Sequence, residues 1–486
     1  MFKPAGCWTG KLSSMVTLVV LLVGQALTVM DGSILVVATP SLQANLHASP
    51  AEAQLVVAIY ALAFGALVVT GARLGDIAGR RRVFMLGLAA FTAASLAGGL
   101  APTPAWLVAA RALAGAAAAL MTPQVLSIIQ AQFEGEARAR AIGAYSMILA
   151  VGVAGGQIIG GLLVSADLLT AAWRPALLIN APIGAALLFG SRRNLPDIKP
   201  SVGQRLDVAG AGLLGVTLLA LIVPLTFGRE YHWPTWVWPC LAISAVSALA
   251  FLLRERHLTD SDGHPLLDLR VFELHGVAAG VLAILLITSC YAGFLLSVTL
   301  HLQGALHFSP IHAGLIFAIY ASGFAAASLT WTHASDATRA RLPSLGPLLM
   351  GAALLAVGVI ASGGGWPIAT APLLFIAGAG HAYGFSPLAN RLTNAIQRSH
   401  QAHLSGLILT ASLVGQAVGI AAFAGIYLTQ ATHGSAHALA ITTTALAATL
   451  LITAFCARSA LASDATASQA HRRSGPVVRC AVKRRS

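Results

Sequence analysis

Apolar stretches of about twenty residues recur along the whole length of this chain, separated by short polar segments. A helix needs about 20 apolar residues to cross a bilayer, so each stretch can cross it once. Charged residues make up 9% of the 486 residues and hydrophobic residues 57%, whereas a water-soluble domain carries about 25% charged residues. The chain cannot cover a soluble globule with polar groups, and we predict an all-α polytopic membrane protein.

The apolar stretches divide into fourteen predicted spans when read in windows of about 19 residues. Backbone groups inside hydrocarbon must be hydrogen-bonded within their own segment, so we expect every span to be a helix. Many Gly and Ala residues within them suit close helix packing. The span centres are Leu22, Leu62, Ala93, Leu120, Val153, Leu187, Leu218, Val246, Leu286, Ala321, Leu354, Ile376, Val418 and Ala448.

The basic residues fall on alternate connecting segments, which indicates orientation because Lys and Arg accumulate on the cytoplasmic side of membrane proteins. With both termini inside, 26 of the 29 basic residues lie on inner segments. Arg174 and Arg229 fall outside, and Arg111 falls within a span. We therefore expect an even number of spans, a location in the cytoplasmic membrane and both termini in the cytoplasm.

The net charge of +13 follows largely from this topology. The basic tail between Arg472 and Arg485 is expected to lie against anionic headgroups or to stay disordered. Nucleic-acid binding is the weaker interpretation, because nothing near the tail supplies a reading head or a stacking platform. Five scattered cysteines show no paired spacing, so we expect no disulfide, no metal and no cofactor.

Asp31 is the only acidic residue that lies well inside a predicted span, and Arg111 is the only basic one. An ionisable side chain in a membrane is costly, by at least about 2.5 kcal/mol, and normally has a partner and a function. A carboxylate beside an arginine gives up its proton, whereas one without a partner in an apolar cavity holds it. The pair is therefore predicted to couple proton movement to a conformational change. The alternative is a purely structural ion pair between two helices.

Two further segments are candidates for function. The loop at 72–82 carries Asp76 among Gly79, Arg80 and Arg81, a turn that can act as an inner latch or simply retain positive charge in the cytoplasm. Span five presents small residues on one face, where another helix can approach closely, although ordinary packing explains each of them singly. These residues are Gly143, Gly152, Gly156, Gly160 and Gly161.

Several of these segments resemble the motifs of one transporter family, in the same order and spacing. The likeness is to the major facilitator superfamily and, within it, to the fourteen-span drug:proton antiporter family. It covers nearly the whole chain, and its strongest matches are the loop signature at 72–83 and the fourth-span pattern at 107–115. The other matching segments are 30–40, the glycines of span five, 173–175, 179–184, 265–272, 302–303 and 309–315.

The resemblance implies two six-helix bundles around a central cavity that opens alternately to either side. It also implies that Asp31 is the proton-linked carboxylate, Arg111 its partner, and Asp76 with Gly79, Arg80 and Arg81 the inner gate. The expected parts are an N-terminus at 1–13, bundles at 14–190 and 274–457, linking helices at 208–253, cytoplasmic loops at 191–207 and 254–273, and a basic tail at 458–486.

The chain departs from the family pattern at several positions. Gln157 stands where the antiporter motif of span five has proline, so a gentler kink is expected. Ala72 and Ile77 replace a glycine and an arginine of the loop signature, which weakens the latch. Ala114 and Val36 replace polar residues of the expected cavity. The cavity therefore keeps one acidic group.

A cavity with one carboxylate favours neutral, zwitterionic or anionic substrates over dications. We predict a proton-coupled antiporter that exports a small organic compound, such as a drug or a natural-product antibiotic. We expect it to be a monomer, and we do not expect it to be an enzyme. The alternatives are a proton-coupled importer on the same fold and a non-transporting membrane sensor. Candidate cavity residues are Ser33, Tyr291, Gln303, Tyr320, His381 and Tyr383.

Overall fold

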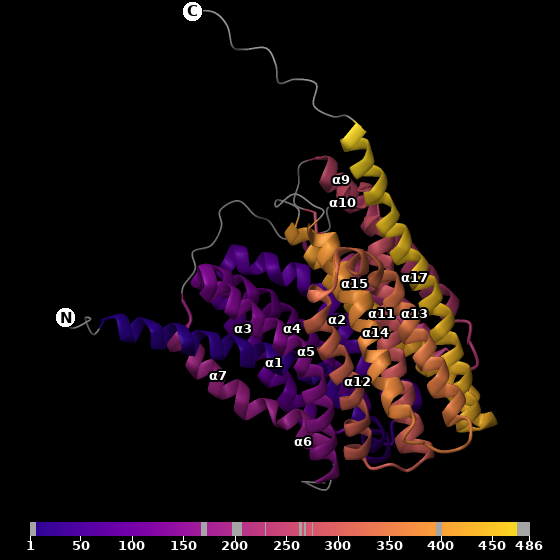
Figure 1. Ribbon diagram of the computed structural model, residues 1–486. Helices are drawn as coiled ribbons and strands as arrows, with labels where there is room; N and C mark the ends of the chain where they lie inside the picture. Colours follow the sequence, from indigo (N-terminus) through magenta and orange to yellow (C-terminus); the bar gives the residue numbers. More distant parts are fainter. Residues whose placement is uncertain are drawn as a thin grey trace, which may run out of the picture.

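The protein is all-helical throughout the part described by a computed structural model, which confirms the all-α part of the predicted fold class (Figure 1). The described ranges are 6–166, 173–196, 207–228, 230–261, 265–266, 269–274, 276–394 and 401–473. Part of the predicted basic tail, from 474 onward, lies outside them, as does Arg229.

The N-terminal half is made of seven helical segments. They are α1 (Gly6–Leu46), α2 (Pro50–Ala78), α3 (Arg80–Gly99), α4 (Pro104–Gln132), α5 (Gly135–Ser165), α6 (Arg174–Leu178) and α7 (Asn180–Asn194).

Two long helices and a short one follow, and then the C-terminal half. The connecting helices are α8 (Val208–Phe227), α9 (Val237–Asp260) and α10 (Arg270–Glu273). The C-terminal half contains α11 (Val277–Thr299), η2 (Leu300–Ala305), α12 (Pro310–Thr330), η3 (Trp331–His333), α13 (Asp336–Ala361), α14 (Thr370–Asn394), α15 (Gln401–Gly419), η4 (Ile420–Ala424), α16 (Gly425–Gln430), η5 (Ala431–His433) and α17 (Ser435–Arg473).

All fourteen predicted span centres fall inside helices, but the predicted count of fourteen spans is not confirmed. Eleven helices of the described chain are long and apolar enough to cross a membrane. The other three centres lie in α5, α7 and α14. Of these, α5 contributes an apolar stretch over Gly155–Ser165, and α7 has only 15 residues.

Short capping sequences explain why the helices begin where they do. Ser49 caps α2 in a reciprocal capping box with Glu52, and Pro50 occupies the first turn. Thr103 before Pro104 and Ser309 before Pro310 cap α4 and α12 through their hydroxyl groups alone, without the reciprocal bond. These side chains accept hydrogen bonds from backbone N–H groups that a helix start leaves unpaired. The turns are therefore encoded locally, and the helices between them run up and down.

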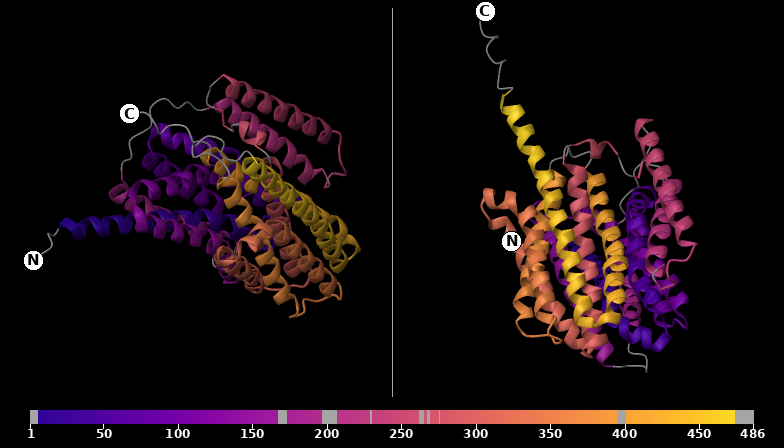
Figure 2. Two further views of the ribbon diagram at one scale, coloured as in Figure 1. Left: turned by 45° about the horizontal axis from the view of Figure 1, so that its top comes forward. Right: turned by 90° about the vertical axis from the view of Figure 1, so that its right-hand side faces the viewer.

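The helices alternate in direction, so their connections gather at two ends of the bundle. We call the end that carries the Ala78–Arg80 turn the basic end, and the other the opposite end. In Figure 1 the basic end is at the top, where α17 finishes. The α8–α9 pair lies to one side of the bundles (Figure 2) and packs through α8 on α2.

The two halves meet along two helix pairs, α5 with α12 and α2 with α15. At the opposite end, the Gln303 side chain donates to the Val37 carbonyl (2.9 Å), and the Ile311 N–H donates to the Ser165 hydroxyl (3.1 Å). These bonds join the N-terminal half to the C-terminal half at the end away from Asp76.

Candidate functional site

Asp31 of α1 and Arg111 of α4 form a buried ion pair in the N-terminal half. Arg111 Nη1 donates to Asp31 Oδ2, and Nη2 lies 3.3 Å from the Asp31 carbonyl oxygen. The Arg111 side chain is 2% exposed and the Asp31 side chain 0%. The structure therefore brings together the two charged residues that the sequence places inside spans.

Asn180, the first residue of α7, completes the coordination of the Asp31 carboxylate. Its Nδ2 donates to Asp31 Oδ1 (2.8 Å) and lies 3.4 Å from the hydroxyl of Ser95 on α3. Both carboxylate oxygens are thus hydrogen-bonded, one to a guanidinium and one to an amide. Charge-assisted bonds of this kind are roughly twice as strong as neutral ones. Sequence analysis did not assign Asn180 to the site, although it lies in the family-like segment 179–184.

Tyr60 of α2 holds the guanidinium from another direction. The Cζ atom of Arg111 lies 4.4 Å from the Tyr60 ring centroid, and the Tyr60 hydroxyl donates to the Thr28 carbonyl (2.7 Å). A Cβ atom added to Gly115 would lie only 2.3 Å from the Tyr60 carbonyl oxygen. Glycine at 115 is therefore what allows α4 to approach α2 closely enough to set Arg111 over the ring.

The glycines of α5 form the contact surface of this helix with α1. Cβ atoms built on Gly152, Gly156 and Gly160 would come within 2.9 Å of Val29, 2.1 Å of Ser33 and 2.8 Å of Ile34, respectively. Gly155, by contrast, has no atom within 4 Å of such a Cβ. The predicted close approach is thus directed at the helix that carries Asp31.

Gly161 and Gln157 extend this contact to the C-terminal half. A Cβ on Gly161 would lie 2.7 Å from the Pro310 carbonyl oxygen, and one on Gly314 of α12 would lie 2.7 Å from that of Gln157. The Gln157 side chain donates to the Ser33 carbonyl (3.2 Å). Gly143 also belongs to α5 but lies outside the residues whose packing is described.

The predicted gate turn is a local structure at the basic end. Gly79 adopts φ 95°, which ends α2 and starts α3. Asp76 and Arg80 pair across it at 2.8 Å, with side chains 26% and 28% exposed. Arg81 donates to the Arg192 carbonyl at the end of α7 (2.5 Å). The described contacts of Asp76 and Arg80 lie within the N-terminal half.

A second cluster of charges ties α8 and α9 together at the basic end. Arg254 donates to Asp207 from Nη2 (2.7 Å) and Nε (2.9 Å), and the Gly210 N–H donates to the same carboxylate (2.9 Å). Burial raises the pKa of Asp207, but the hydrogen bonds from Arg254 and Gly210 and the charges of Arg254 and Arg73 outweigh it and hold this pKa below its ordinary value.

This cluster also reaches the gate helix. Glu255 is fully buried, and Arg73 of α2 lies within range of the charges of Glu255, Asp207 and Asp76. Arg73 also donates to the Pro265 carbonyl. Sequence analysis assigned Glu255 to a cytoplasmic loop beginning at 254, whereas helix α9 continues to Asp260. Its burial has no signal in the sequence, because it depends on how α9 packs against α8.

Three of the six candidate cavity residues lie together in the C-terminal half. The Tyr291 ring stacks on the rings of His381 (5.0 Å between centroids) and Tyr320 (5.8 Å), and the Tyr320 hydroxyl lies 3.0 Å from His381 Nδ1. The other three are elsewhere. Ser33 lies in the α1–α5 contact, Gln303 bonds to Val37, and Tyr383 has no ring contact with the cluster in the described chain.

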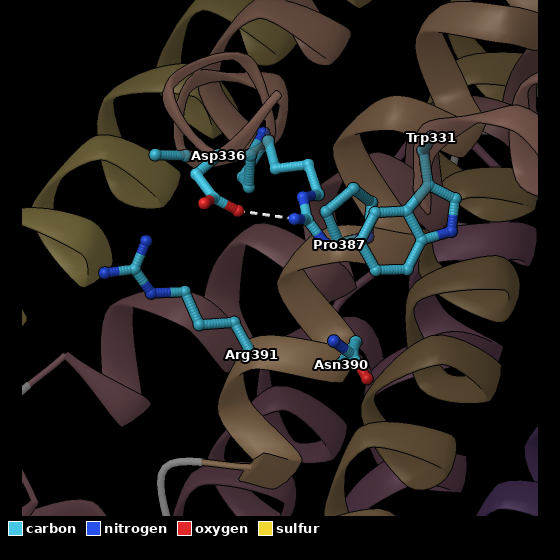
Figure 3. Close-up of a pocket in the computed structure, with 8 residues that line it drawn as sticks. Trp331, Asp336, Pro387, Asn390 and Arg391 are labelled. Carbon is cyan, nitrogen blue, oxygen red and sulfur yellow. Dashed lines mark hydrogen bonds and ion pairs between the residues drawn. The ribbon is translucent and has the colours of Figure 1, made fainter. Parts of the chain in front are cut away.

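A pocket of about 270 Å³ opens at the basic end between η3, α13 and α14 (Figure 3). The Asp336–Arg339 ion pair forms part of its wall, and the Asp336 side chain is 94% exposed. None of the candidate cavity residues lines it. Its lining residues are Trp331, Asp336, Arg339, Ala340, Pro343, Pro387, Asn390 and Arg391. Within the described residues, no three metal-ligating side chains gather at one place.

Two helical halves that meet along two helix pairs, with eleven helices long and apolar enough to cross a membrane in the described chain, are the architecture of a polytopic membrane protein. The chain belongs to the major facilitator superfamily, whose sequence profile matches residues 21–420. Family membership and the transporters among its relatives indicate a transporter of small molecules and not an enzyme.

Several relatives carry names that describe export or resistance. The "Probable actinorhodin transporter" of Streptomyces coelicolor is 34% identical over 85% of this chain and 73% of its own length. The "Cephamycin export protein CmcT" of Amycolatopsis lactamdurans is 41% identical over 64% of each chain. The "Puromycin resistance protein pur8" of Streptomyces alboniger is 37% identical over 70% of this chain and 66% of its own.

Solved structures with low sequence identity share the fold. An inward-facing bacterial homologue of the human lysosomal transporter Spinster superposes with a TM-score of 0.66 at 17% identity, covering 94% of this chain and 98% of that one. A POT family transporter gives the same TM-score at 12% identity, over 92% and 98% of the two chains. At these identities the likeness concerns the fold alone.

Proposed function

We propose that this protein exports a small organic compound of the antibiotic type across the cytoplasmic membrane, in exchange for protons. The observation that carries the proposal is the buried, fully coordinated Asp31 carboxylate. Relatives named for export of, or resistance to, actinorhodin, cephamycin, puromycin and tetracenomycin C support the cargo class. In this proposal the chain has fourteen spans, which include α5, the α6–α7 segment and α14, and both termini are cytoplasmic.

Coupling follows from the two environments that alternating access offers to Asp31. While Arg111 and Asn180 bind it, the carboxylate is stabilised as the charged form. A movement of α1 or α4 that separates the pair leaves a carboxylate in an apolar surrounding, where binding a proton removes the cost of the buried charge. Substrate on one side and a proton on the other then stabilise different conformations, and each cycle exchanges the two.

The glycine contacts of α5 and the Asp76 turn have distinct parts in this cycle. Gly152, Gly156 and Gly160 keep α5 against the turns of α1 that flank Asp31, so a shift of α5 is passed to the ion pair. The Asp76–Arg80 turn stiffens the end of α2 that must move when the basic end closes.

Transport into inverted membrane vesicles tests the proposal directly. The membrane is energised, and puromycin, cephamycin and tetracenomycin C are offered to the wild type, Asp31→Asn and an empty-vector control. We expect accumulation that collapses with an uncoupler and is lost in Asp31→Asn. Normal proton-driven accumulation by Asp31→Asn would refute the coupling role. Accumulation only in vesicles of native orientation would identify an importer instead.

A further inference from the structure

The C-terminal half contains an aromatic cluster that the coupling mechanism does not use. It consists of Tyr291 and Phe294 on α11, Tyr320 and Phe324 on α12, and His381 and Phe385 on α14. The His381 ring is at its centre, with centroid distances of 4.8 Å to Phe324, 5.0 Å to Tyr291 and 6.2 Å to Phe385. Three helices thus direct aromatic side chains at one imidazole.

Hydrogen bonding within the cluster leaves two polar atoms free. His381 Nδ1 and the Tyr320 hydroxyl satisfy each other at 3.0 Å. The Tyr291 hydroxyl and His381 Nε2 have no hydrogen-bond partner in the described chain. Neither of these two atoms is fully buried. Both atoms are therefore accessible to solvent, although His381 as a whole is only 6% exposed. Side by side on stacked rings, they offer a hydrogen-bonding edge to an accessible space.

That space lies inside the protein and not at its lipid surface. Tyr291 is partly buried and packs against a hydrophobic core cluster that contains residues of both halves, among them Val36 and Phe294. In Val277–Ala305, the span that carries Tyr291, 78% of an apolar 18-residue window is buried, the highest share among the eleven candidate spans of the described chain. Partial exposure of a side chain on so enclosed a helix indicates an internal surface.

The cluster and the ion pair lie at the same depth. Tyr291, Tyr320 and His381 fall near the middle of the Val277–Ala305, Pro310–His333 and Thr370–Asn394 helices. Asp31 falls near the middle of the Ser14–Leu46 span. The N-terminal half thus presents charge, and the C-terminal half presents stacked rings and an imidazole, at one level of the membrane.

We propose that Tyr291 and His381 form the substrate contact of the C-terminal half, and that the substrate is a flat aromatic compound carrying a phenolic or quinone-type oxygen. The inference rests on the proposed export function and specifies its cargo. A flat ring continues the stack that Tyr291 and His381 already form, and its oxygen pairs with His381 Nε2. The cluster contains no carboxylate, and Asp31 is occupied by Arg111, so a flat organic cation lacks a counter-charge.

Binding to the purified full-length protein without any ion gradient tests this assignment. The probes are alizarin, a flat dihydroxylated quinone, its parent anthraquinone, which lacks the hydroxyls, and ethidium, a flat cation. The variants are Tyr291→Leu, Tyr291→Phe, His381→Leu and His381→Gln. Phe455→Leu is the matched control, because it also removes a ring but lies on α17 with 72% exposure. Elution volume and thermal midpoint show that each variant is folded.

We expect Tyr291→Leu to weaken alizarin binding about tenfold, since it removes the stacking surface, and Tyr291→Phe, which keeps the ring, to weaken it less. Phe455→Leu should stay within about threefold of the wild type. His381→Leu should abolish the preference for alizarin over anthraquinone, and His381→Gln should retain part of it. Unchanged alizarin binding in folded Tyr291→Leu and His381→Leu, or ethidium binding as tight as that of alizarin, would overturn the assignment.

The two proposals fail separately. If proton-driven efflux is unchanged by substitutions at Tyr291 and His381, the proposed substrate contact is refuted and coupled export is still supported. If alizarin binds tightly and this binding depends on Tyr291, but no compound accumulates under a proton gradient, coupled export is refuted and the substrate contact is still supported.

Discussion

Asn180 donates a 2.8 Å hydrogen bond to the one oxygen of the Asp31 carboxylate that Arg111 leaves open. The amide comes from α7 and the guanidinium from α4, so the carboxylate of α1 joins three helices. With Tyr60 of α2 stacked on Arg111, four helices of the N-terminal half converge on one ion pair. Any movement of one of them changes the surroundings of Asp31.

Replacing Asn180 by leucine should slow proton-driven transport about tenfold. The change keeps the volume but removes a hydrogen bond to a charged group, a contribution of about 1.5–3 kcal/mol. Transport rates in energised vesicles at several pH values measure the effect. Asn180→Gln retains the amide and serves as the control. Equal transport by Asn180→Leu and the wild type would show that Arg111 alone prepares Asp31.

Arg111→Lys should lose most transport although the positive charge remains. Lysine lacks the planar fork of two nitrogens with which Arg111 reaches the carboxylate and the carbonyl of Asp31, and its head group cannot stack flat on Tyr60. We expect a loss of more than tenfold in rate for Arg111→Lys and for Tyr60→Leu. Tyr60→Phe retains the ring and should lose less. Full transport by Arg111→Lys would reduce the role of Arg111 to that of a point charge.

Much of the fold could be predicted from the sequence because lipid imposes a simple code. Every predicted span centre falls in a helix, since apolar length alone determines which segments can cross a membrane. The Asp31–Arg111 pair was also predictable, because charges inside apolar segments are few. Asn180 and Tyr60 were not, since polar or amphipathic residues in helices are common and only packing shows which of them face a charge.

Glu255 illustrates what a linear reading of charge cannot show. It sits between two arginines in a segment that looks like a cytoplasmic loop, yet it is buried between helices. The aromatic cluster is similar. Tyr291, Tyr320 and His381 are separated by up to 90 residues, and their contact depends on how α11, α12 and α14 pack. Span length and loop charge carry no information on such contacts.

Gly156→Ala should impair both stability and transport, whereas Gly155→Ala should be tolerated. A methyl group at 156 would meet Ser33 Oγ at 2.1 Å and the Met30 carbonyl oxygen at 2.7 Å, while one at 155 meets nothing within 4 Å. Overpacking of this kind costs about 1–3 kcal/mol. Thermal midpoints in detergent and transport rates are measured for both variants. Because each variant replaces one glycine of α5 by alanine, a difference between them reports the contact with α1 and not the loss of a glycine. Equal behaviour of the two variants would contradict the α1–α5 contact.

Asp76→Asn should slow transport about tenfold while leaving thermal stability nearly unchanged. The Asp76–Arg80 pair is partly exposed, and such i,i+4 pairs contribute only about 0.3–0.5 kcal/mol. Asp336→Asn is the matched control, because the Asp336–Arg339 pair also lies at the basic end one turn apart and is more exposed. A similar transport loss in both variants would indicate that surface charge, and not the α2–α3 turn, determines the rate.

Asp207→Asn should remove an acid-sensitive part of the stability of the α8–α9 pair. The folded pKa of Asp207 lies below its ordinary value of about 3.9, so its charge stabilises the folded state above that ordinary value. This stabilisation is lost as pH falls through the lower, folded value. Because Arg254 is 40% exposed, we expect a contribution of only about 1 kcal/mol at neutral pH.

Asparagine at position 207 can still cap α8, so the Asp207→Asn variant isolates the effect of the charge. Thermal midpoints between pH 7 and pH 3 should fall less steeply for Asp207→Asn than for the wild type, and parallel curves would show that the Asp207–Arg254 bonds add nothing to stability.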